Sequence, residues 1–230
     1  MIPTPRPLVH VVAAAVMDGT GRVLIAQRPD GKHLAGGWEF PGGKLEPREE
    51  RGAGLARELR EELGIITGGP FRPLIRVRHA YPTRDILLDV FVVKTFSGEP
   101  QGLDGQALRW CTQEELAEVK LLPADGPIVR ALRLPEVLRE ASSADYTVGE
   151  LGGARDMDRH GRSRLGGVLC ATLGEAAVAA GAGAEFLVLS ETLSASELRD
   201  LCRLVSVPVY ARGFAVEEAW VLGASGTHFL

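Results

Sequence analysis

Cysteine and long apolar runs are scarce in this chain, and both absences exclude classes of protein. Its 230 residues include only three cysteines, Cys111, Cys170 and Cys202, an odd number without metal-ligand spacing. We therefore expect reduced thiols and a cytoplasmic protein. No apolar run approaches the roughly 18 residues of a membrane-spanning helix, and the opening MIPTPRPLVHVV lacks the pattern of a signal peptide. No membrane partner is expected.

An excess of basic residues is lacking too. Lysine and arginine number 26 against 30 aspartates and glutamates, which gives a net charge of −4. Without a basic tract, a nucleic-acid polymer is not an expected partner. A small nucleotide substrate remains compatible with this charge, because a bound metal ion supplies local positive charge. The chain is long enough for two modest cores.

Acidic side chains are instead concentrated in residues 43–65, which read GKLEPREERGAGLARELREELGI. Leu55, Leu59 and Leu63 recur every four residues and predict a helix over residues 48–63 with one apolar stripe. Two glycines in its first turns cost about 1 kcal/mol each relative to alanine, which permits a later start. The glycine after Leu63 is placed to end the helix.

Three carboxylates lie on one face of this helix, because Glu58, Glu61 and Glu62 are spaced i, i+3 and i+4. Adjacent carboxylates repel one another unless a cation lies among them, and Mg²⁺ or Mn²⁺ prefers oxygen ligands. The alternative is a solvated charged surface. That alternative does not require the accompanying Glu49 and Arg57, so the pattern favours a divalent-metal site that acts on a diphosphate.

The same segment resembles the Nudix box, G-x5-E-x7-R-E-U-x-E-E-x-G-U with U aliphatic, and every defined position matches. The resemblance implies a metal-dependent hydrolase in which Arg57 pairs with Glu49 and Glu58 acts as general base. It implies a catalytic set of Glu58, Glu61, Arg57 and Glu49. The implied metal ligands are the Gly43 carbonyl, Glu58, Glu61, Glu62 and Asp104.

Further matches bring residues 5–135 close to the MutT-type branch, which hydrolyses 8-oxo-dGTP. They are AQRP, WEFPGGKLEP, SGEPQGLDGQALRW and LLPADGPIVRAL. The resemblance implies release of nucleoside monophosphate and pyrophosphate. Another nucleotide or a thiamine-related diphosphate is the alternative substrate. The implied substrate-binding residues are Arg28, Glu39, Phe40 and Asp125.

Two acidic residues depart from the MutT-type pattern. Asp104 stands where a loop residue, often glutamate, reaches the metal ions; an ordinary turn residue is the alternative. Asp125 stands where asparagine is usual, and an ionised aspartate accepts hydrogen bonds without donating them. Either burial raises the pKa of Asp125 or the base preference differs. The alternative role of Asp125 is to cap a helix that begins at Gly126 or Pro127.

The elements around the box predict a mixed α/β fold. The resemblance implies the Nudix α/β/α sandwich over residues 1–135. Strands are expected at 8–16, 22–27, 71–81, 86–96 and 108–111, a loop at 32–43, and helices at 113–117 and 125–134.

The composition changes around residues 135–145, and residues 141–144 are typical of a linker or a degenerate segment. Strands and helices alternate after it, which predicts parallel βα units in a second domain over 136–230. Thr172 and Ser194 are expected helix caps. Strands are expected at 167–171, 185–190, 207–212 and 227–230, with a remnant near 146–151, and helices at 174–181, 195–204 and 215–222.

This second domain resembles half of a thiamine-phosphate synthase or TenI-like barrel, on the segments at 166–190 and 207–229. The resemblance implies a partial parallel (β/α) half-barrel. Its loop at 191–195 lacks proline and lysine, and Phe214 replaces a glycine that lets backbone approach phosphate. We therefore expect a non-catalytic domain. Its open edge requires cover from the first domain or a second chain, and a homodimer through the half-barrel is one solution.

Overall fold

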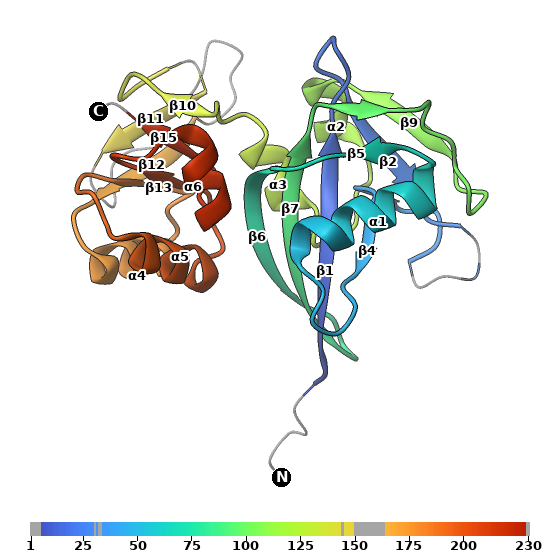
Figure 1. The fold of residues 1–230 in the computed structure, drawn as a ribbon, viewed down its shortest axis with the longest axis horizontal. Helices are drawn as coiled ribbons and strands as arrows, with labels where there is room; N and C mark the ends of the chain where they lie inside the picture. Colours follow the sequence, from blue (N-terminus) through green and yellow to red (C-terminus); the bar gives the residue numbers. More distant parts are fainter. Residues whose placement is uncertain (1–5, 30, 32–33, 144, 150–163, 229–230) are drawn as a thin grey trace. The chain divides into compact units, whose positions relative to one another are not determined.

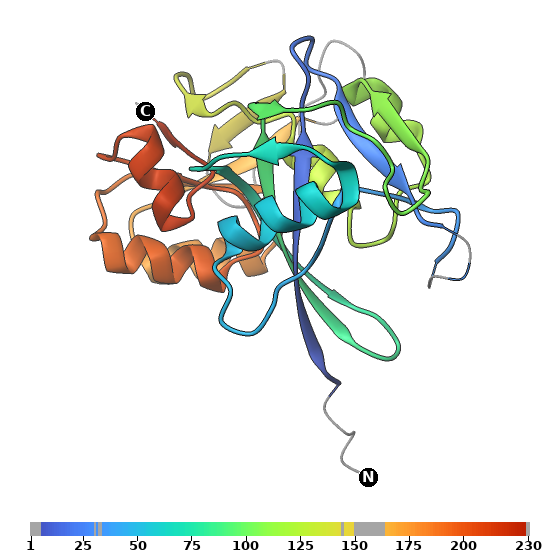
Figure 2. The same cartoon turned by 45° about the vertical axis from the view of Figure 1, so that its right-hand side comes forward.

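The computed structural model describes residues 6–29, 31, 34–143, 145–149 and 164–228, and the chain divides into two compact units (Figures 1 and 2). The first contains residues 1–71 and 77–129, and the second contains residues 72–76 and 130–230. Among the described helices, none combines the length and apolar character that a membrane crossing requires.

The elements as far as α3 form a mixed sheet of order β4-β1-β7-β6, a sheet of order β3-β2-β9 and the pair β5-β8. Strand β1 runs parallel to β7 and antiparallel to β4. The bounds are β1 Leu8–Val16, β2 Val23–Gln27, β3 Trp38–Glu39, β4 Gly42–Lys44, α1 Arg51–Leu63, β5 Ile66–Thr67, β6 Arg72–Ala80, β7 Asp85–Val93, β8 Phe96–Ser97, β9 Leu108–Cys111, α2 Gln113–Glu118 and α3 Gly126–Ala131.

The predicted mixed α/β fold is confirmed, and β1 and β9 have the predicted bounds. The expected loop at 32–43 is wrong in part, because it contains β3 and the start of β4. Strands of two or three residues are too short to show an alternation of apolar and polar residues. Strands β5 and β8 were not predicted for the same reason. Helix α1 begins at Arg51 rather than at residue 48, since Arg48 has φ of +68° and Glu50 is extended.

Side chains alternate along β1, so the two faces of the larger sheet have different environments. Val12, Ala14 and Val16 pack in one cluster with the leucine stripe of α1. The intervening residues, among them Val11 and Ala13, line a pocket. The sheet therefore has a helix on one face and a cavity on the other.

On the α1 side of this sheet, β7 carries a buried aspartate. Asp89 is 4% exposed, its Oδ2 lies 2.6 Å from His10 Nε2, and Arg51 Nη1 donates to its Oδ1 at 3.3 Å. A carboxylate removed from water needs such partners. Because Arg51 is the first residue of α1, the network ties the start of the motif helix to the sheet.

Asp89→Ala is expected to lower the free energy of unfolding by about 2 kcal/mol, since it leaves two polar partners without their acceptor. Urea denaturation measures this loss. Asp85→Ala is the control on the same strand: its partner Arg6 and the aspartate are both about half exposed, so about 0.5 kcal/mol is expected. Equal losses in the two variants would contradict the anchoring role of Asp89.

The second unit is built on a six-stranded sheet of order β10-β15-β14-β13-β12-β11, in which every strand pair is parallel. Thr172 and Ser194 cap α4 and α5 through their side chains, as predicted. The bounds are β10 Val137–Leu138, β11 Tyr146–Gly149, β12 Leu165–Cys170, α4 Leu173–Gly181, β13 Phe186–Leu189, α5 Ala195–Leu204, β14 Val209–Ala211, α6 Val216–Leu222 and β15 Gly226–His228.

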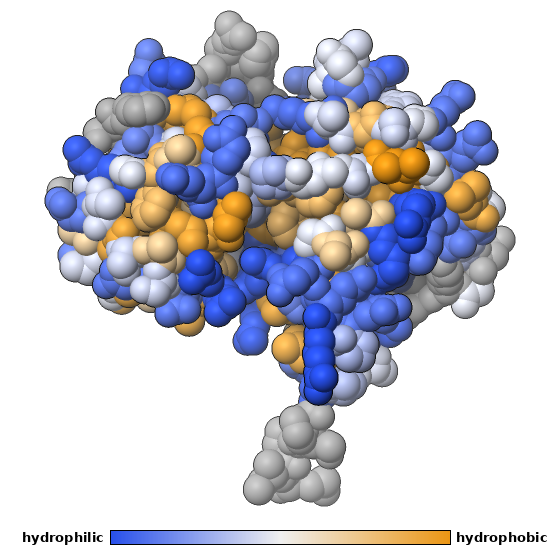
Figure 3. Space-filling view, viewed as in Figure 1, coloured by the Kyte–Doolittle hydropathy of each residue, from blue (hydrophilic) through white to orange (hydrophobic). Residues whose placement is uncertain are grey.

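This sheet is curled into a half-barrel, as the fold class predicted. One core cluster contains Leu138 and Tyr146 from the two edge strands together with Phe186 and Tyr210 from inner strands. The aromatic rings of Tyr146, Phe186 and Tyr210 pack edge to face. The opposite face of the sheet packs against α4, α5 and α6, and apolar side chains reach the surface over these helices (Figure 3).

Strand β10, at residues 137–138, was not predicted from the sequence. This two-residue strand pairs with β15, with Val137 opposite Thr227 and Leu138 opposite His228. Strand β15 lies about 90 residues away in the chain, so no local sequence pattern indicates this pairing. Residues 150–151 of the predicted remnant strand and residues 229–230 of the last predicted strand lie outside the described residues.

Candidate active site

Helix α1 begins after an ordered turn that is built around Arg57. Its Nε and Nη2 donate to Glu49 Oε1 and Oε2, both at 2.9 Å, which is the bidentate geometry expected from the sequence. Nη2 also donates to the Lys44 carbonyl at 3.1 Å. Nη1 donates to Glu58 at 2.9 Å and to Glu61 at 3.1 Å. One guanidinium thus joins β4, the turn and two carboxylates of α1.

These contacts perturb the ionisation of both partners. Hydrogen bonds from Arg57 and from the Glu46 backbone N–H lower the pKa of Glu49 to about 2. The carboxylates of Glu49, Glu58 and Glu61 raise the pKa of Arg57. The turn therefore keeps its charges across the physiological pH range.

Two glycines of β4 permit a close approach to the rest of the site. A Cβ on Gly42 would lie 2.1 Å from the Val12 carbonyl oxygen, and its φ of +150° is one that L side chains rarely adopt. A Cβ on Gly43 would lie 2.2 Å from Glu58 Oε2. Any larger residue at 43 would push the Glu58 carboxylate away from the strand.

Glu62 reaches from the last turn of α1 to the edge strand β4, where its Oε2 accepts a hydrogen bond from Gly42 N–H at 3.0 Å. Burial raises the pKa of Glu62 to about 7, and the charges of Glu39, Asp104 and Glu58 add to the rise. The Gly42 N–H opposes it. A half-buried carboxylate surrounded by other carboxylates is an environment that a cation would stabilise.

The box carboxylates lie together on α1 as predicted, but they do not converge on one point. Glu58 and Glu61 turn to Arg57, and Glu62 turns to Gly42. Within the described residues no group of three or more His, Cys, Asp or Glu side chains is arranged to hold a metal ion. The donor chemistry fits a hard divalent cation, and its binding would require Glu58 and Glu61 to turn away from Arg57.

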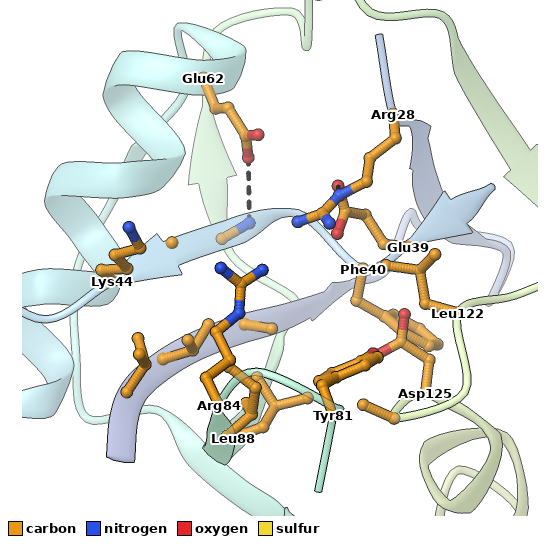
Figure 4. Close-up of a pocket in the computed structure, with 17 residues that line it drawn as sticks. Arg28, Glu39, Phe40, Lys44, Glu62, Tyr81, Arg84, Leu88, Leu122 and Asp125 are labelled. Carbon is orange, nitrogen blue, oxygen red and sulfur yellow. Dashed lines mark hydrogen bonds and ion pairs between the residues drawn. The ribbon is translucent and has the colours of Figure 1, made fainter. Parts of the chain in front are cut away.

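A pocket of about 430 Å³ lies on the face of the sheet opposite α1 and reaches Glu62 (Figure 4). Gly42, Gly43 and Glu62 line one part of it. The predicted substrate-binding residues line the other, and Arg28 Nε donates to Glu39 Oε1 at 2.9 Å there. The full lining is Val9, Val11, Ala13, Arg28, Glu39, Phe40, Gly42, Gly43, Lys44, Glu62, Tyr81, Arg84, Ile86, Leu88, Leu122, Ala124 and Asp125.

Asp125 has a strongly perturbed carboxyl group in this pocket. It is 5% exposed, and its Oδ2 is a buried oxygen for which the described part of the chain supplies no hydrogen-bond partner. Burial raises its pKa to about 8, and the charge of Glu39 adds to the rise, while the Phe40 backbone N–H and Arg28 oppose it. Beside the Phe40 and Tyr81 rings (Figure 4), Asp125 can present a neutral acid to a ligand.

The alternative role of Asp125 as a helix cap receives only positional support. Helix α3 does begin at Gly126, directly after Asp125. The Ile128 N–H donates to the main-chain carbonyl of Asp125 at 3.0 Å, and Pro127 has no N–H to offer. Asp125 Oδ2 makes no capping hydrogen bond with the described part of the chain and is available to the pocket.

Asp104 lies in a turn closed by a hydrogen bond from Gly105 N–H to the Gly102 carbonyl at 3.0 Å. Its side chain is exposed, and its charge helps to raise the pKa of Glu62. The structure thus places Asp104 in a turn and also within electrostatic reach of the box.

Lys44 and Arg84 bring positive charge to the pocket beyond the predicted site residues. Lys44 was not predicted because it follows the two glycines on a strand too short to show which face it points to. Arg84, which the sequence places in a turn between β6 and β7, extends its guanidinium into the cavity (Figure 4). A lysine in the position of Lys44 has no sequence signal that distinguishes it from a surface residue.

Comparisons with known proteins show which family the chain is similar to. The sequence pattern of the NUDIX domain matches residues 12–131. The CTP pyrophosphohydrolase of Escherichia coli (strain K12) is 42% identical over 135 residues, which are 58% of this chain and 96% of the relative. The 8-oxo-dGTP diphosphatase of Proteus vulgaris is 44% identical over 91 residues, which are 39% of this chain and 80% of the relative.

Among solved structures, the solution structure of the E. coli ORF135 protein is similar at 41% identity. It covers 55% of this chain and 89% of that chain, with a TM-score of 0.49. The NUDIX match alone spans just over half of the chain and includes the complete box on α1. With its arginine-centred turn, its glycine strand and its carboxylate helix in place, this chain belongs to the NUDIX domain family of hydrolases.

Proposed function

We propose that this protein is a divalent-metal-dependent nucleoside triphosphate pyrophosphohydrolase that converts 8-oxo-dGTP into 8-oxo-dGMP and pyrophosphate. One observation carries the proposal: Gly42, Gly43 and Glu62 line the same pocket as Asp125. A ligand in this cavity can therefore place its phosphates at the box and its base at the acid. The volume of about 430 Å³ lies in the usual range of small-molecule sites. Such an activity removes an oxidised nucleotide from the pool.

Mg²⁺ is the proposed cofactor, and Mn²⁺ is the alternative. Glu58, Glu61, Glu62 and the Gly43 carbonyl would hold it, with Asp104 as a further or water-mediated ligand. When bound, the metal offsets phosphate charge and acidifies a water molecule. The crowded carboxylates around Glu62 support a cation there.

The residues of the chain itself orient the reaction. Glu58, held against Gly43, is the proposed general base that takes a proton from the attacking water. Arg57 and Glu49 act as positioning residues, since their bidentate pair fixes the turn that precedes α1. Glu61 is the most exposed of the box carboxylates, so its contact with Arg57 is the least costly to exchange for a metal ion.

Base selection is proposed to depend on Asp125. A neutral carboxyl donates one hydrogen bond and accepts another. The 8-oxoguanine edge presents O6 as acceptor beside an N7–H donor, whereas unmodified guanine presents two acceptors at O6 and N7. Protonated Asp125 fits the oxidised edge and leaves one unmatched acceptor with the normal one. Arg28 and Glu39 would supply further contacts to the nucleoside.

CTP is a second candidate substrate for the same pocket. Cytosine carries an amino donor at N4 beside the N3 acceptor, which also matches a neutral carboxyl. The E. coli relative that is 42% identical to this chain is named a CTP pyrophosphohydrolase. Because Asp125 stands where the MutT-type pattern usually has an asparagine, 8-oxoguanine and cytosine both remain candidate bases.

A nucleotide panel with product identification tests the proposal. The purified protein with Mg²⁺ is assayed with 8-oxo-dGTP, dGTP, CTP and a thiamine diphosphate, and products are separated by chromatography. We expect kcat/KM for 8-oxo-dGTP at least about tenfold above dGTP, since one unmatched buried hydrogen bond costs about 1.4 kcal/mol or more. Equal values for these two would reject the oxidised base, and a preference for CTP would select the second candidate.

The second unit is proposed to be a truncated TenI-like half-barrel without catalytic activity. The curled parallel sheet supports the barrel relationship. Exposed apolar side chains on its helices, among them Val178, Leu204 and Val221, are compatible with a partner surface. A homodimer through this unit stays a prediction.

A further inference from the structure

The loop of residues 101–106 completes the end of the motif helix. The last carbonyl groups of a helix have no partner within it. Gly64 N–H donates to the Arg60 carbonyl, Gln101 N–H to the Leu63 carbonyl and Leu103 N–H to the Glu62 carbonyl, each at 3.0 Å. The loop is therefore bound to α1 through its backbone.

Gln106 adds a side-chain bridge at the same place. It is only 7% exposed. Its Nε2 donates to the Glu62 carbonyl at 3.0 Å, and its Oε1 accepts from the Asp104 N–H at 2.8 Å. A Cβ on Gly102 would lie 2.0 Å from the Gln106 carbonyl oxygen, so the turn closes tightly around this residue.

The two ends of the Gln106 amide connect the two parts of the candidate metal site. One end holds the last turn of α1, which carries Glu61 and Glu62. The other end holds the backbone of Asp104, whose side chain is exposed. The backbone hydrogen bonds from Gln101 and Leu103 hold the loop to α1 beside this amide.

We propose that Gln106 is a positioning residue for metal binding, because its amide holds the Asp104 turn in register with the carboxylates of α1. The inference rests on the proposed metal-dependent function. It assigns Gln106 no contact with metal or substrate. Its effect passes through Asp104, which makes the two residues energetically coupled.

The test measures metal binding directly. Mn²⁺ binding without nucleotide is followed by electron paramagnetic resonance, and the Mg²⁺ concentration for half-maximal hydrolysis is measured beside it. Gln106→Met keeps the length of the side chain and removes both hydrogen bonds, so we expect about tenfold weaker Mn²⁺ binding. Gln101→Met, on an exposed side chain of the same loop, is the matched control and should stay within about twofold of wild type.

A double-mutant cycle separates positioning from general destabilisation. In an Asp104→Asn background, Gln106→Met should change Mn²⁺ affinity by less than about twofold, because the residue it positions no longer carries a charge. An undiminished tenfold loss in that background would overturn the proposal. So would wild-type affinity in the Gln106→Met single variant.

Gln106→Glu covers the case in which Gln106→Met fails to fold by circular dichroism. It keeps the acceptor for Asp104 N–H and loses the donor to the Glu62 carbonyl. Its added negative charge alone would strengthen Mn²⁺ binding, whereas lost positioning weakens it. Weaker binding supports the proposal, and equal or tighter binding overturns it. A wild-type protein that neither binds Mn²⁺ nor hydrolyses a nucleotide would overturn the proposed function as well.

Discussion

Glu61→Gln is expected to lower kcat by about 10²-fold or more while leaving the fold intact. The glutamine keeps the shape of the side chain but removes the charge with which Glu61 would hold a metal ion. Its side chain is 56% exposed and accepts a hydrogen bond from Arg57 at 3.1 Å. Substitutions at such sites change the free energy of unfolding by about 0.5 kcal/mol at most. Steady-state kinetics at saturating Mg²⁺ and a thermal melt measure both parts.

Glu50→Gln is the matched control for this substitution. Glu50 is exposed, directly precedes α1, and makes no side-chain hydrogen bond as its N-cap. The same loss of one negative charge at this position should leave kcat within about twofold of wild type. Comparable losses at Glu50 and Glu61 would show a general charge effect, and full activity in Glu61→Gln would reject its place in the metal site.

Asp125 is expected to make activity fall at alkaline pH. Its pKa is raised from 3.8 to about 8, so the carboxyl is neutral below that value and ionised above it. Ionisation removes the proton that the proposed base contact donates. With a pKa near 8, kcat/KM for 8-oxo-dGTP should fall about tenfold between pH 6 and pH 9 through this group. Asp125→Asn keeps a donor and an acceptor at every pH, so it should lack this fall.

The ratio of wild-type to Asp125→Asn kcat/KM isolates the effect, because other titrating groups such as Glu62 are common to both proteins. A ratio that stays constant from pH 6 to pH 9 would contradict a titrating Asp125. A ratio that rises with pH would contradict the donor role, since the ionised carboxylate would then be the better form.

Stability provides an independent readout of the same group. Because the folded-state pKa of Asp125 is raised, the folded protein holds a proton that the unfolded chain releases between about pH 4 and pH 8. The free energy of unfolding contributed by this group is therefore fully present below pH 4 and is lost as pH rises to 8. In thermal melts, the Tm of Asp125→Asn relative to that of wild type should rise from pH 5 to pH 9.

Local patterns predicted the elements whose signals lie within a few residues. The leucine stripe predicted α1, the apolar run rich in β-branched residues predicted β1, and Gly64 ends α1 in the left-handed conformation with φ of +70° as expected. The pairing of Arg57 with Glu49 was also predictable, because both belong to one motif of fixed spacing. Two-residue strands such as β3 and β10 were not predictable, since they exist only through their partners.

The sequence by itself determined the family, the reaction class and the face of α1 that carries the carboxylates, because covalent spacing and helical geometry fix these within one segment. Tertiary structure decided which distant residues share the pocket. It placed the orphan oxygen of Asp125 beside Phe40, turned Glu62 to the backbone of Gly42, and tied Gln106 to the end of α1. Burial and charge at those meeting points depend on segments up to 97 residues apart, the separation of Arg28 and Asp125. They set the pKa values and hydrogen bonds on which substrate choice and metal affinity are proposed to depend.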